Sequence, residues 1–587
     1  MSHRAYLFSL KIAFALRDAA AEGYGKHELG KDLLAGLSVG IIAIPLAMAL
    51  AIASGVPPQY GLYTAIIAGF IIPLCGGSRY SISGPTAAFV VILYPVAQKY
   101  GLSGLLLATM LSGGLLVLMA FLRLGRFIQY IPEAVTLGFT AGIAVVIATL
   151  QLKDLFGLQV ASMPEHYMEK LYALMQAADT GQWPSLVVAV ATLWLMWLWP
   201  QFKTPIPPHL PAVLFGTVVA LILAWFDLPV ETIGSRFHYT SEQGVELAGI
   251  PDMLPSFILP WQLPGEPLTL SSQLVTDLLA AAFAMAMLGA IESLLCAVVL
   301  DGMTGRRHSA NSELLGQGIG NIVAPFFGGI TATAAIARSA ANVRAGAVSP
   351  IAAMVHALVV LVALFALAPW LSYLPMPAMA ALLLVVAWNM SEANKALHLI
   401  NTAPRSDIWV FLVCFSFTVL FDMVIAITSG IIIAALLFVK EVAEMTKVTD
   451  VSDQRKLVPE KLAEGHHVFR ITGPLFFAAA DRIFAELALL SHGKQQVVLL
   501  MDGVSLLDAG GLAALHKFLL ACEAQNCHVM MVDLQFQPLR TLAKAKVRAE
   551  AGLLSFYPTL ADALKVLPKR NLGHPSAEDD FLHDSGL

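Results

Sequence analysis

Long apolar stretches dominate the chain from about residue 32 to residue 440, and polar residues take over after them. Each stretch holds about 15–25 residues, the length that a helix needs to cross a hydrocarbon core of about 30 Å. The pattern therefore predicts about fourteen membrane segments. We expect them at residues 33–53, 60–76, 85–97, 104–122, 134–152, 185–200, 211–226, 276–300, 313–327, 331–345, 351–369, 374–389, 408–424 and 426–440.

Two of the predicted segments are too short for ordinary spanning helices, and small or helix-breaking residues precede each of them. We expect them to be half-helices that begin inside the membrane, where free backbone N–H groups favour an anion. The residues at these starts are Ser83, Gly84, Pro85 and Thr86 in the third segment and Thr331 and Thr333 in the tenth.

The spacing of these features predicts an internal repeat. Pro45 precedes Thr86 by 41 residues, and Glu292 precedes Thr333 by the same 41 residues. Equivalent points lie 247 residues and seven crossings apart, and an odd number of crossings reverses the orientation in the membrane. The predicted fold class is therefore a polytopic α-helical membrane protein with 7+7 inverted segments, which is the plan of secondary transporters.

Charged residues outside the segments indicate the orientation. Cytoplasmic loops carry the excess of lysine and arginine, and basic residues follow the even-numbered segments here. They are Arg123, Arg126, Lys203, Arg306, Arg307, Arg344, Lys395 and Arg405. The loop at about 228–275 is mainly acidic, with Glu231, Glu242, Glu246, Asp252 and Glu266 against Arg236. We expect a multi-pass protein of the inner membrane with both termini in the cytoplasm.

Composition supports this prediction and excludes other classes. Hydrophobic residues make up 58% and charged residues 13% of the chain, against about 45–50% and about 25% in soluble domains. A net charge of -5 provides no basic field for nucleic acid. The five cysteines show neither metal-type clustering nor a paired extracellular framework, so we expect free thiols, no metal and no cofactor.

Two charged residues lie inside apolar segments. Glu292 is a carboxylate that costs several kcal/mol in the bilayer unless it faces a cavity, is paired or is protonated. Arg338 either stands beside the second half-helix start or marks that helix's cytoplasmic end together with Arg344. Two helix ends and Arg338 sum to about +2, and to about +1 if Glu292 is ionised. Proton-coupled uptake of an anion would use this difference in local charge between the protonated and the ionised state of Glu292.

Short strands and helices alternate in the polar region, which predicts a small α/β domain. The turn Asp508, Ala509, Gly510 and Gly511 joins a strand to a helix; such a turn either binds an anion or partner at the helix start or is simply well capped. We see no nucleophile paired with a general base in this region, so we do not expect an enzyme.

The expected domains are an N-terminal cytoplasmic arm (1–31), a transmembrane transport domain (32–445), a linker (446–462), the α/β domain (463–570) and a flexible tail (571–587).

Stretches along nearly the whole chain resemble the sulfate permease (SulP) family of anion transporters, which carries a C-terminal STAS domain. They are residues 44–49, 58–63, 82–87, 290–295, 311–318, 327–329 and 337–343. The resemblance implies seven-plus-seven inverted repeats, a core domain that moves against a gate domain, and a homodimer. Within the family, the first, third, eighth and tenth segments and residues 471–480 resemble bacterial aerobic C4-dicarboxylate transporters.

The resemblance also implies the site residues. The substrate would contact Thr86 and Ala87 on the third segment and Ala334, Ala335 and Arg338 on the tenth, with Glu292 as the coupling residue.

Two departures from the family pattern matter. Pro45-Leu46 replaces the Pro-Gln of many sulfate-type members, which weakens the case for sulfate. The loop 508–511 lacks the Asp-Ser-Ser-Gly of phosphorylatable STAS relatives, so we do not expect phosphoserine switching there.

These observations predict a secondary transporter that takes up a C4-dicarboxylate such as succinate, fumarate or aspartate with protons by alternating access. One alternative is a sulfate or bicarbonate carrier, with Glu292 as a cation ligand if the carrier is sodium-coupled. Another is a membrane-anchored sensor that gives no flux and whose STAS domain recruits a cytosolic protein. The expected partners are a small anion, a proton or sodium ion, membrane lipid, a second copy of the chain and a cytosolic protein.

Overall fold

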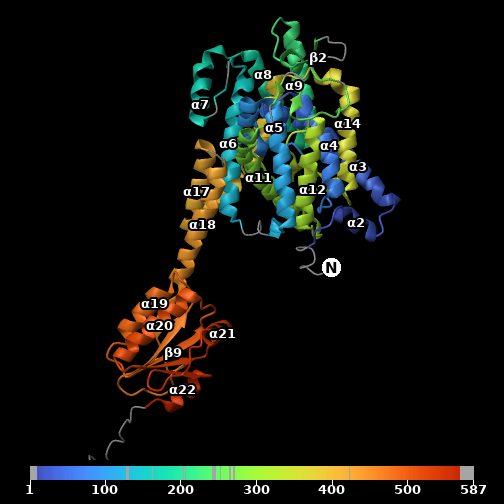
Figure 1. The fold of residues 1–587 in the computed structure, drawn as a ribbon. Coiled ribbons are helices and arrows are strands. Elements are labelled where there is room, and N and C mark those ends of the chain that lie inside the picture. The colour runs from blue at the N-terminus through green and yellow to red at the C-terminus, as the bar shows by residue number, and fades with distance from the viewer. Residues whose placement is uncertain are drawn as a thin grey trace, which may run out of the picture. The chain divides into compact units, whose positions relative to one another are not determined.

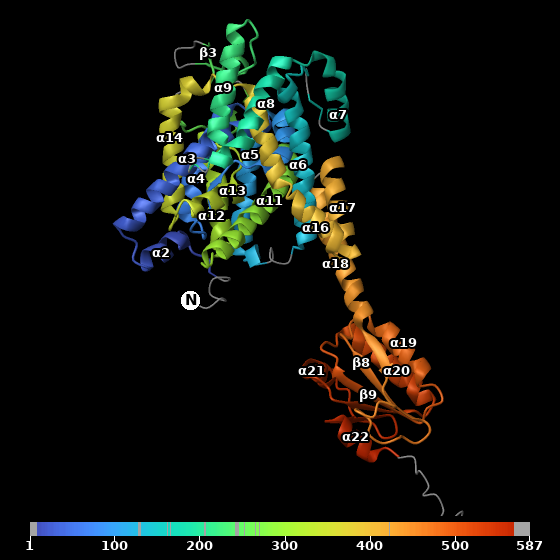
Figure 2. The ribbon, with the colours of Figure 1, turned by 180° about the vertical axis from the view of Figure 1, so that it is seen from behind.

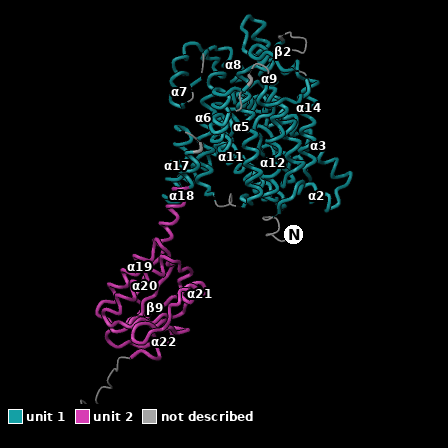
Figure 3. The backbone as a smooth tube through the Cα atoms, in the orientation of Figure 1, with its two compact units in different colours: residues 1–431 teal, residues 432–587 magenta. Residues whose placement is uncertain are grey.

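A computed structural model describes residues 9–568 apart from 127–130, 161–162, 165, 203, 205–206, 241–245, 252, 264–265, 269–270 and 422. Lys203, Glu242, Asp252 and the expected tail at 571–587 lie outside the described residues. Internal contacts divide the chain into residues 1–431 and 432–587 (Figure 3). The division falls inside helix α18 (Met423–Met445), because Val439, Val442 and Ala443 of that helix pack on Phe476 and Ala479 of the second unit.

The first unit is a helical bundle (Figures 1 and 2). Its first repeat contains α3 (Lys26–Ala53), α4 (Pro58–Cys75), α5 (Val90–Phe121), α6 (Glu133–Phe156), α8 (Trp183–Leu198) and α9 (His209–Trp225). Gly101 interrupts α5 with φ 64° and ψ -172°, so α5 supplies both the third and the fourth segment. Left-handed φ is accessible to glycine at little cost, which explains the residue at this break.

The second repeat has the same order of elements. It contains α11 (Ser272–Thr304), α12 (Ala310–Val323), α13 (Ile336–Arg344), α14 (Ile351–Leu371), α15 (Met376–Met390), α17 (Arg405–Leu420) and α18. Among the described residues, nine helices are long and apolar enough to span a membrane, and shorter helices make up the remaining segments. The prediction of about fourteen segments in inverted repeats with two half-helices is confirmed.

The packing pairs reflect the repeat. Helix α14 of the second repeat packs against α3 and α4 of the first, and α5 of the first repeat packs against α11 and α12 of the second. Short helices occupy equivalent places, with α7 (Tyr167–Gln176) after the fifth segment and α16 (Ala393–Thr402) after the twelfth. Small residues permit the close approach, because a Cβ on Gly113 of α5 would lie 2.8 Å from the backbone of Gly318 and Ile322 in α12.

The described part of the N-terminal arm packs on the bundle. Helix α2 (Phe14–Ala21) lies against α4, and the buried Arg79 forms ion pairs with Asp18 at 2.6 Å and Glu22 at 2.8 Å. Helix α3 begins at Lys26, and its buried Asp32 accepts hydrogen bonds from the Val348 amide at 2.7 Å and the Ser349 hydroxyl at 2.5 Å. These contacts anchor the first residues of α3 to the start of the second repeat's α14.

Small elements cap the end of the bundle that carries α7. They are α10 (Ile233–Arg236) and two short hairpins, β2 (His238–Thr240) with β3 (Glu246–Ala248) and β4 (Gln262–Leu263) with β5 (Glu266–Pro267). Arg236 of α10 forms ion pairs with Glu231 and, at 2.7 Å, with Asp154 at the end of α6.

The second unit contains a five-stranded sheet with the order β11-β10-β9-β8-β7. Strands β8 (His466–Thr472), β9 (Gln496–Gly503), β10 (His528–Val532) and β11 (Leu554–Tyr557) are parallel, and β7 (Lys447–Asp450) is antiparallel at the edge. Helices α19 (Ala480–Leu490), α20 (Ala509–Ala524) and α21 (Phe536–Lys544) connect the successive parallel strands, and α22 (Leu560–Val566) follows β11. Phe469, Leu499, Phe518 and Met531 are among the residues of its separate apolar core. The predicted α/β domain is confirmed.

The loop 508–511 is a tightly packed helix cap. Asp508 accepts the Gly511 amide at 2.8 Å through Oδ1 and the Phe477 amide at 3.1 Å through Oδ2. A Cβ on Gly510 would lie 2.7 Å from the Phe477 Cα, and one on Gly511 would lie 2.4 Å from the Leu475 carbonyl oxygen. Both oxygens of the Asp508 carboxylate accept hydrogen bonds, and both glycines lie against backbone atoms of residues 475–477. The geometry therefore supports the interpretation of a capped turn.

A matched pair of serine substitutions tests this packing. In a fragment of residues 446–568, Gly510→Ser should lower the free energy of unfolding by about 1–3 kcal/mol, because the new Cβ overlaps backbone that cannot move aside. Ala509→Ser at the exposed neighbouring position should change it by less than about 0.5 kcal/mol. Urea denaturation followed by circular dichroism makes the comparison. Equal stability of the two variants would contradict the described packing.

Candidate functional site

Two extended segments cross inside the first unit and form its candidate site. Strands β1 (Ser83–Gly84) and β6 (Thr333–Ala334) pair antiparallel, with Ser83 opposite Ala334 and Gly84 opposite Thr333. The 3-10 helix η1 (Ala87–Phe89) and α5 follow β1, and α13 follows β6. Because the strands are antiparallel, the two helices leave in opposite directions and both N-termini lie at the crossing.

The helix starts lie at the C-terminal ends of the expected ranges. We expected the starts within residues 83–86 and 331–335, and the helices begin directly after these ranges, at Ala87 and Ile336. The residues within these ranges are extended because they pair with each other, and Pro85 favours an extended residue before it. Ala334 is fully buried in the pair, and the Ala335 amide donates to the Ile82 carbonyl at 3.0 Å. This amide is therefore already satisfied by the crossing.

Buried side chains complete the hydrogen bonds of the crossing. Asn321 acts as a local strand partner, since its Nδ2 donates to the Ala332 carbonyl at 2.9 Å and its Oδ1 accepts the Ala332 amide at 2.8 Å. The Ile82 amide donates to the Ser339 hydroxyl at 2.9 Å. The Ile330 amide donates to the Thr64 hydroxyl at 2.8 Å. Backbone groups that cannot reach water are satisfied in this way.

One face of α12 supplies several of these groups. Glu313, Gln317 and Asn321 follow each other at four-residue intervals, which places them on one face of a helix. Glu313 accepts the Gly77 amide at 3.0 Å and the Ser78 amide at 2.9 Å, and Gln317 donates to the Ser83 hydroxyl at 3.2 Å. This role was not predicted from the sequence, although three polar residues at helical spacing in an apolar region were a usable signal.

The predicted threonines of the tenth segment brace β6. The hydroxyls of Thr333 and Ser293 lie 2.6 Å apart, and those of Thr331 and Thr109 lie 2.8 Å apart. Ser293 belongs to α11 and Thr109 to the second half of α5. Thr331 and Thr333 therefore tie the crossing to both repeats.

The charged candidates meet at this crossing. The Thr86 hydroxyl donates to Glu292 Oε2 at 2.9 Å. The Arg338 side chain, which is only 3% exposed, donates from Nη2 to the Pro85 carbonyl at 2.7 Å. A Cβ on Gly84 would lie 3.0 Å from Arg338 Nη1, so the absence of a side chain there lets the guanidinium approach β1 closely. Arg338 thus lies buried at the crossing, whereas Arg344 at the end of α13 is exposed.

Arg338 retains unused hydrogen-bonding capacity. Within the described part of the chain, its buried Nε and Nη1 have no hydrogen-bond partner. Two helix N-termini, each equivalent to about half a positive charge, lie beside this guanidinium. Arginine donors and helix N-termini both favour an oxyanion. The arrangement is suited to bind an anion next to a carboxylate that a threonine holds in place.

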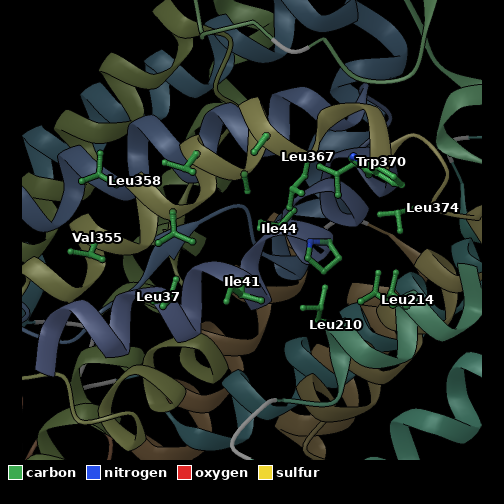
Figure 4. A pocket seen from close by; sticks show the side chains of 17 residues that line it. Leu37, Ile41, Ile44, Leu210, Leu214, Val355, Leu358, Leu367, Trp370 and Leu374 are labelled. Carbon is green, nitrogen blue, oxygen red and sulfur yellow. The ribbon is translucent and has the colours of Figure 1, made fainter. Parts of the chain in front are cut away.

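A different cavity, shown in Figure 4, is unsuited to an anion. It has a volume of about 680 Å³ and lies between α3, α9 and α14. Its lining is hydrocarbon and includes Ile41, Leu214, Leu358 and Trp370. In a membrane, apolar lipid chains would occupy such a groove. The lining of the cavity contains none of the charged residues of the crossing.

Broken helices that meet inside inverted repeats define the class of secondary membrane transporters. The chain belongs to the sulfate permease family, whose model matches residues 29–414, and a STAS domain model matches residues 460–563. It is therefore a multi-pass membrane anion transporter and not an enzyme.

Individual relatives agree with this assignment. "Putative sulfate transporter YvdB" of Bacillus subtilis (strain 168) is 38% identical over 539 residues, covering 91% of this chain and 97% of the relative. "Bicarbonate transporter BicA" of Picosynechococcus sp. is 30% identical over 477 residues, covering 78% and 80%. The structure of murine Slc26a9 in the inward-facing state has a TM-score of 0.80 at 19% identity, covering 96% of this chain and 95% of that one. The BicA transmembrane domain has a TM-score of 0.58 at 26% identity, covering 70% and 98%.

Replacing the residue that satisfies β6 tests the crossing. Asn321→Leu keeps a similar volume but leaves the amide and carbonyl of Ala332 unsatisfied, at a cost of about 1–3 kcal/mol for each group. We expect a clearly lower thermal midpoint for the purified protein in detergent. Asn401→Leu, on the exposed side of α16, is the control and should leave the midpoint nearly unchanged. A normal midpoint for Asn321→Leu would show that the crossing does not depend on this bond.

Proposed function

We propose that this anion transporter takes up C4-dicarboxylates, such as succinate, fumarate and aspartate, together with protons. The observation that carries the proposal is the meeting of Thr86, Glu292 and Arg338 at the β1–β6 crossing. The choice of dicarboxylates rests on the resemblance of the first, third, eighth and tenth segments to C4-dicarboxylate transporters. The buried, apolar Leu46 supports it further, because many sulfate-type members carry glutamine at this position.

Coupling follows from the charge at the crossing. With Glu292 ionised, the two helix ends and Arg338 leave a local charge of about +1, and with Glu292 protonated the charge is about +2. An anion therefore binds better when Glu292 carries a proton, and by linkage the bound anion favours uptake of that proton. Thr86 keeps the carboxyl group beside the anion in either state.

Alternating access would divide the bundle into two bodies. We assign α3, α4, α5 and α11 to α14, which build the crossing, to the core domain. We assign α6, α8, α9, α15, α17 and α18 to the gate domain. The charge pattern supports cytoplasmic termini in a bacterial inner membrane, and we propose a homodimer whose STAS domains are open to a cytosolic protein partner.

A second candidate substrate class has its own support. The named relatives are a sulfate and a bicarbonate transporter, so the same site could carry an inorganic oxyanion, with Glu292 binding a sodium ion instead of a proton. Counterflow in proteoliposomes with labelled succinate, sulfate and bicarbonate separates the two classes. We expect exchange of succinate. Exchange of sulfate or bicarbonate alone would overturn the dicarboxylate assignment.

Neutralising the carboxylate tests the coupling. Glu292→Gln keeps the shape and the contact with Thr86 but removes the titrating group, so uptake driven by an inward proton gradient should fall by more than about tenfold, while the anion still binds with an affinity that no longer depends on pH. Glu133→Gln, at the exposed start of α6, should behave like wild type. Retention of the wild-type pH dependence by Glu292→Gln would remove Glu292 from the coupling mechanism.

Removing the arginine tests the anion site. Arg338→Ala should weaken anion binding by about tenfold or more, because a charge-assisted hydrogen bond contributes about 1.5–3 kcal/mol. Arg338→Lys should retain part of the affinity, and Arg344→Ala should retain all of it. Calorimetric titration of the purified variants measures each affinity. Wild-type affinity in a folded Arg338→Ala protein would contradict the proposed site.

A further inference from the structure

Helix α21 of the second unit carries a concentration of basic residues. Residues 536–550 contain four basic residues and one acidic residue, Glu550. The basic residues are Arg540, Lys544, Lys546 and Arg548, and all four are exposed. Within the part of the chain that the structure describes, none of these four side chains forms an ion pair or a hydrogen bond. Their positive charge is therefore open to a ligand outside the domain.

The same helix leaves large apolar side chains on its outer side. Pro538 and Leu542 are buried and hold α21 against the domain. Phe536 is 79% exposed and Leu539 is 50% exposed. Exposed aromatic and leucine side chains beside basic residues are typical of helices that lie at a membrane–water interface. We call Phe536, Leu539 and the four basic residues the α21 surface.

More exposed apolar side chains lie at the end of the sheet where α21 begins. Strands β8, β9 and β10 are parallel, so the loops that follow them lie at one edge of the sheet. Phe477 follows β8, Leu506 follows β9 and Phe536 follows β10, and each of these side chains is exposed. The Gln537 side chain exchanges hydrogen bonds with the backbone of Leu507 at 2.8 and 3.1 Å, which fixes α21 to the loop after β9.

Helix α18 ends at this same edge of the sheet. Thr446, directly after α18, donates from its hydroxyl to the Pro474 carbonyl at 3.0 Å. Lys447 of β7 pairs with Thr472 at the end of β8. The second unit includes α18 from Ile432 onward together with the whole sheet (Figure 3). The edge with the exposed apolar side chains thus lies where the last membrane helix ends.

The end of α18 lies close to the level of the lipid headgroups. The first charged residues of α18 are Lys440 and Glu441, and charged residues mark the end of the hydrocarbon core. Thr446 follows Lys440 by six residues, which is about 9 Å along a helix. The headgroup region extends about 5–7 Å beyond the hydrocarbon core on each side. The edge of the sheet therefore begins next to the headgroups.

Anionic phospholipid matches both parts of the α21 surface. Its headgroups attract basic side chains over about one Debye length. The boundary between headgroups and acyl chains accepts side chains such as those of Phe536 and Leu539. An acidic protein would match the four positive charges, but it would not explain why the apolar side chains gather at the edge where the chain leaves the membrane.

We propose that the α21 surface binds anionic phospholipid of the membrane that α18 crosses. The four basic residues bind the headgroups, and Phe536 and Leu539 enter the boundary between headgroups and acyl chains. This contact orients the second unit on the lipid surface. It does not depend on which anion is transported or on the coupling ion, so it goes beyond the proposed function.

Vesicle flotation tests the α21 surface. The fragment of residues 446–568 contains the complete sheet and its apolar core. We expect it to bind vesicles of phosphatidylcholine with phosphatidylglycerol but not vesicles of phosphatidylcholine alone. Replacing the four basic residues by glutamine should weaken binding by about tenfold or more, because each basic residue near an anionic surface contributes to the attraction. Phe536→Ser should weaken binding several-fold at every salt concentration.

Two control variants carry the same kinds of change elsewhere in the fragment. One replaces four other exposed basic residues by glutamine, namely Arg455, Lys456, Lys461 and Lys517. The other is Leu489→Ser on α19, since Leu489 is 79% exposed like Phe536. Both controls should bind nearly as well as wild type. Equal losses in the surface variants and the controls would show unspecific attraction and would overturn the proposal.

Thiol labelling tests the contact in the full-length protein. Ala543→Cys places a thiol on the exposed side of α21, and Ala524→Cys places one at the exposed end of α20, and wild type corrects for the native cysteines. In nanodiscs, phosphatidylglycerol should slow the reaction of Ala543→Cys with an uncharged polyethylene glycol maleimide and leave Ala524→Cys unchanged. Equal shielding of Ala543→Cys in neutral lipid would assign the surface to a protein contact. Free reaction in both lipids would show that the surface stays in water. Either result would overturn the proposal.

Discussion

The membrane-spanning unit depends on one constraint, which is that backbone polar groups in lipid must find partners within the protein. The chain interrupts two of its helices inside the bundle, and the exposed backbone is satisfied by pairing β1 with β6. Asn321, Gln317, Ser339 and Thr64 supply the remaining bonds from the surrounding helices. The polar face of α12 thus supplies hydrogen bonds to two extended segments, which would be unstable in lipid without these partners.

The same crossing brings the charged groups of the candidate site together. Antiparallel pairing places both helix N-termini together, and Gly84 leaves room for the Arg338 guanidinium against the backbone. Glu292 reaches this place from α11 and is held by Thr86 of the other repeat. A positive centre with an adjacent carboxyl group therefore results from the inverted repeat itself, and its charge changes when the carboxyl group gains or loses a proton.

Much of the fold was predictable from the sequence because each membrane segment is an apolar run of definite length. The break in α5 at Gly101 and the half-helix of α13 matched irregularities that were visible in that pattern. The strands were not predictable, since β1 and β6 consist of two residues each and pair across about 250 residues of sequence. Their pairing explains why both helices begin only after the extended residues.

The candidate site was only partly predictable. A charge in an apolar run identified Glu292 and Arg338, but the sequence could not decide whether Arg338 faced the site or the membrane boundary. Its burial and its bond to Pro85 settle that question. The supporting residues were missed because their partners are distant in the sequence. At Asp508, by contrast, the cap and the helix it serves are adjacent, so the local turn pattern already offered the capped turn as one of two interpretations.

We propose that the β1–β6 crossing both binds the anion and couples its binding to a proton. Calorimetry of anion binding to the purified protein, carried out near neutral pH in buffers with different ionisation enthalpies, counts the protons that accompany binding. Linkage predicts uptake that approaches about one proton per bound anion in the pH range where Glu292 titrates. Anion binding without any proton uptake across the pH range in which the protein transports would contradict the account.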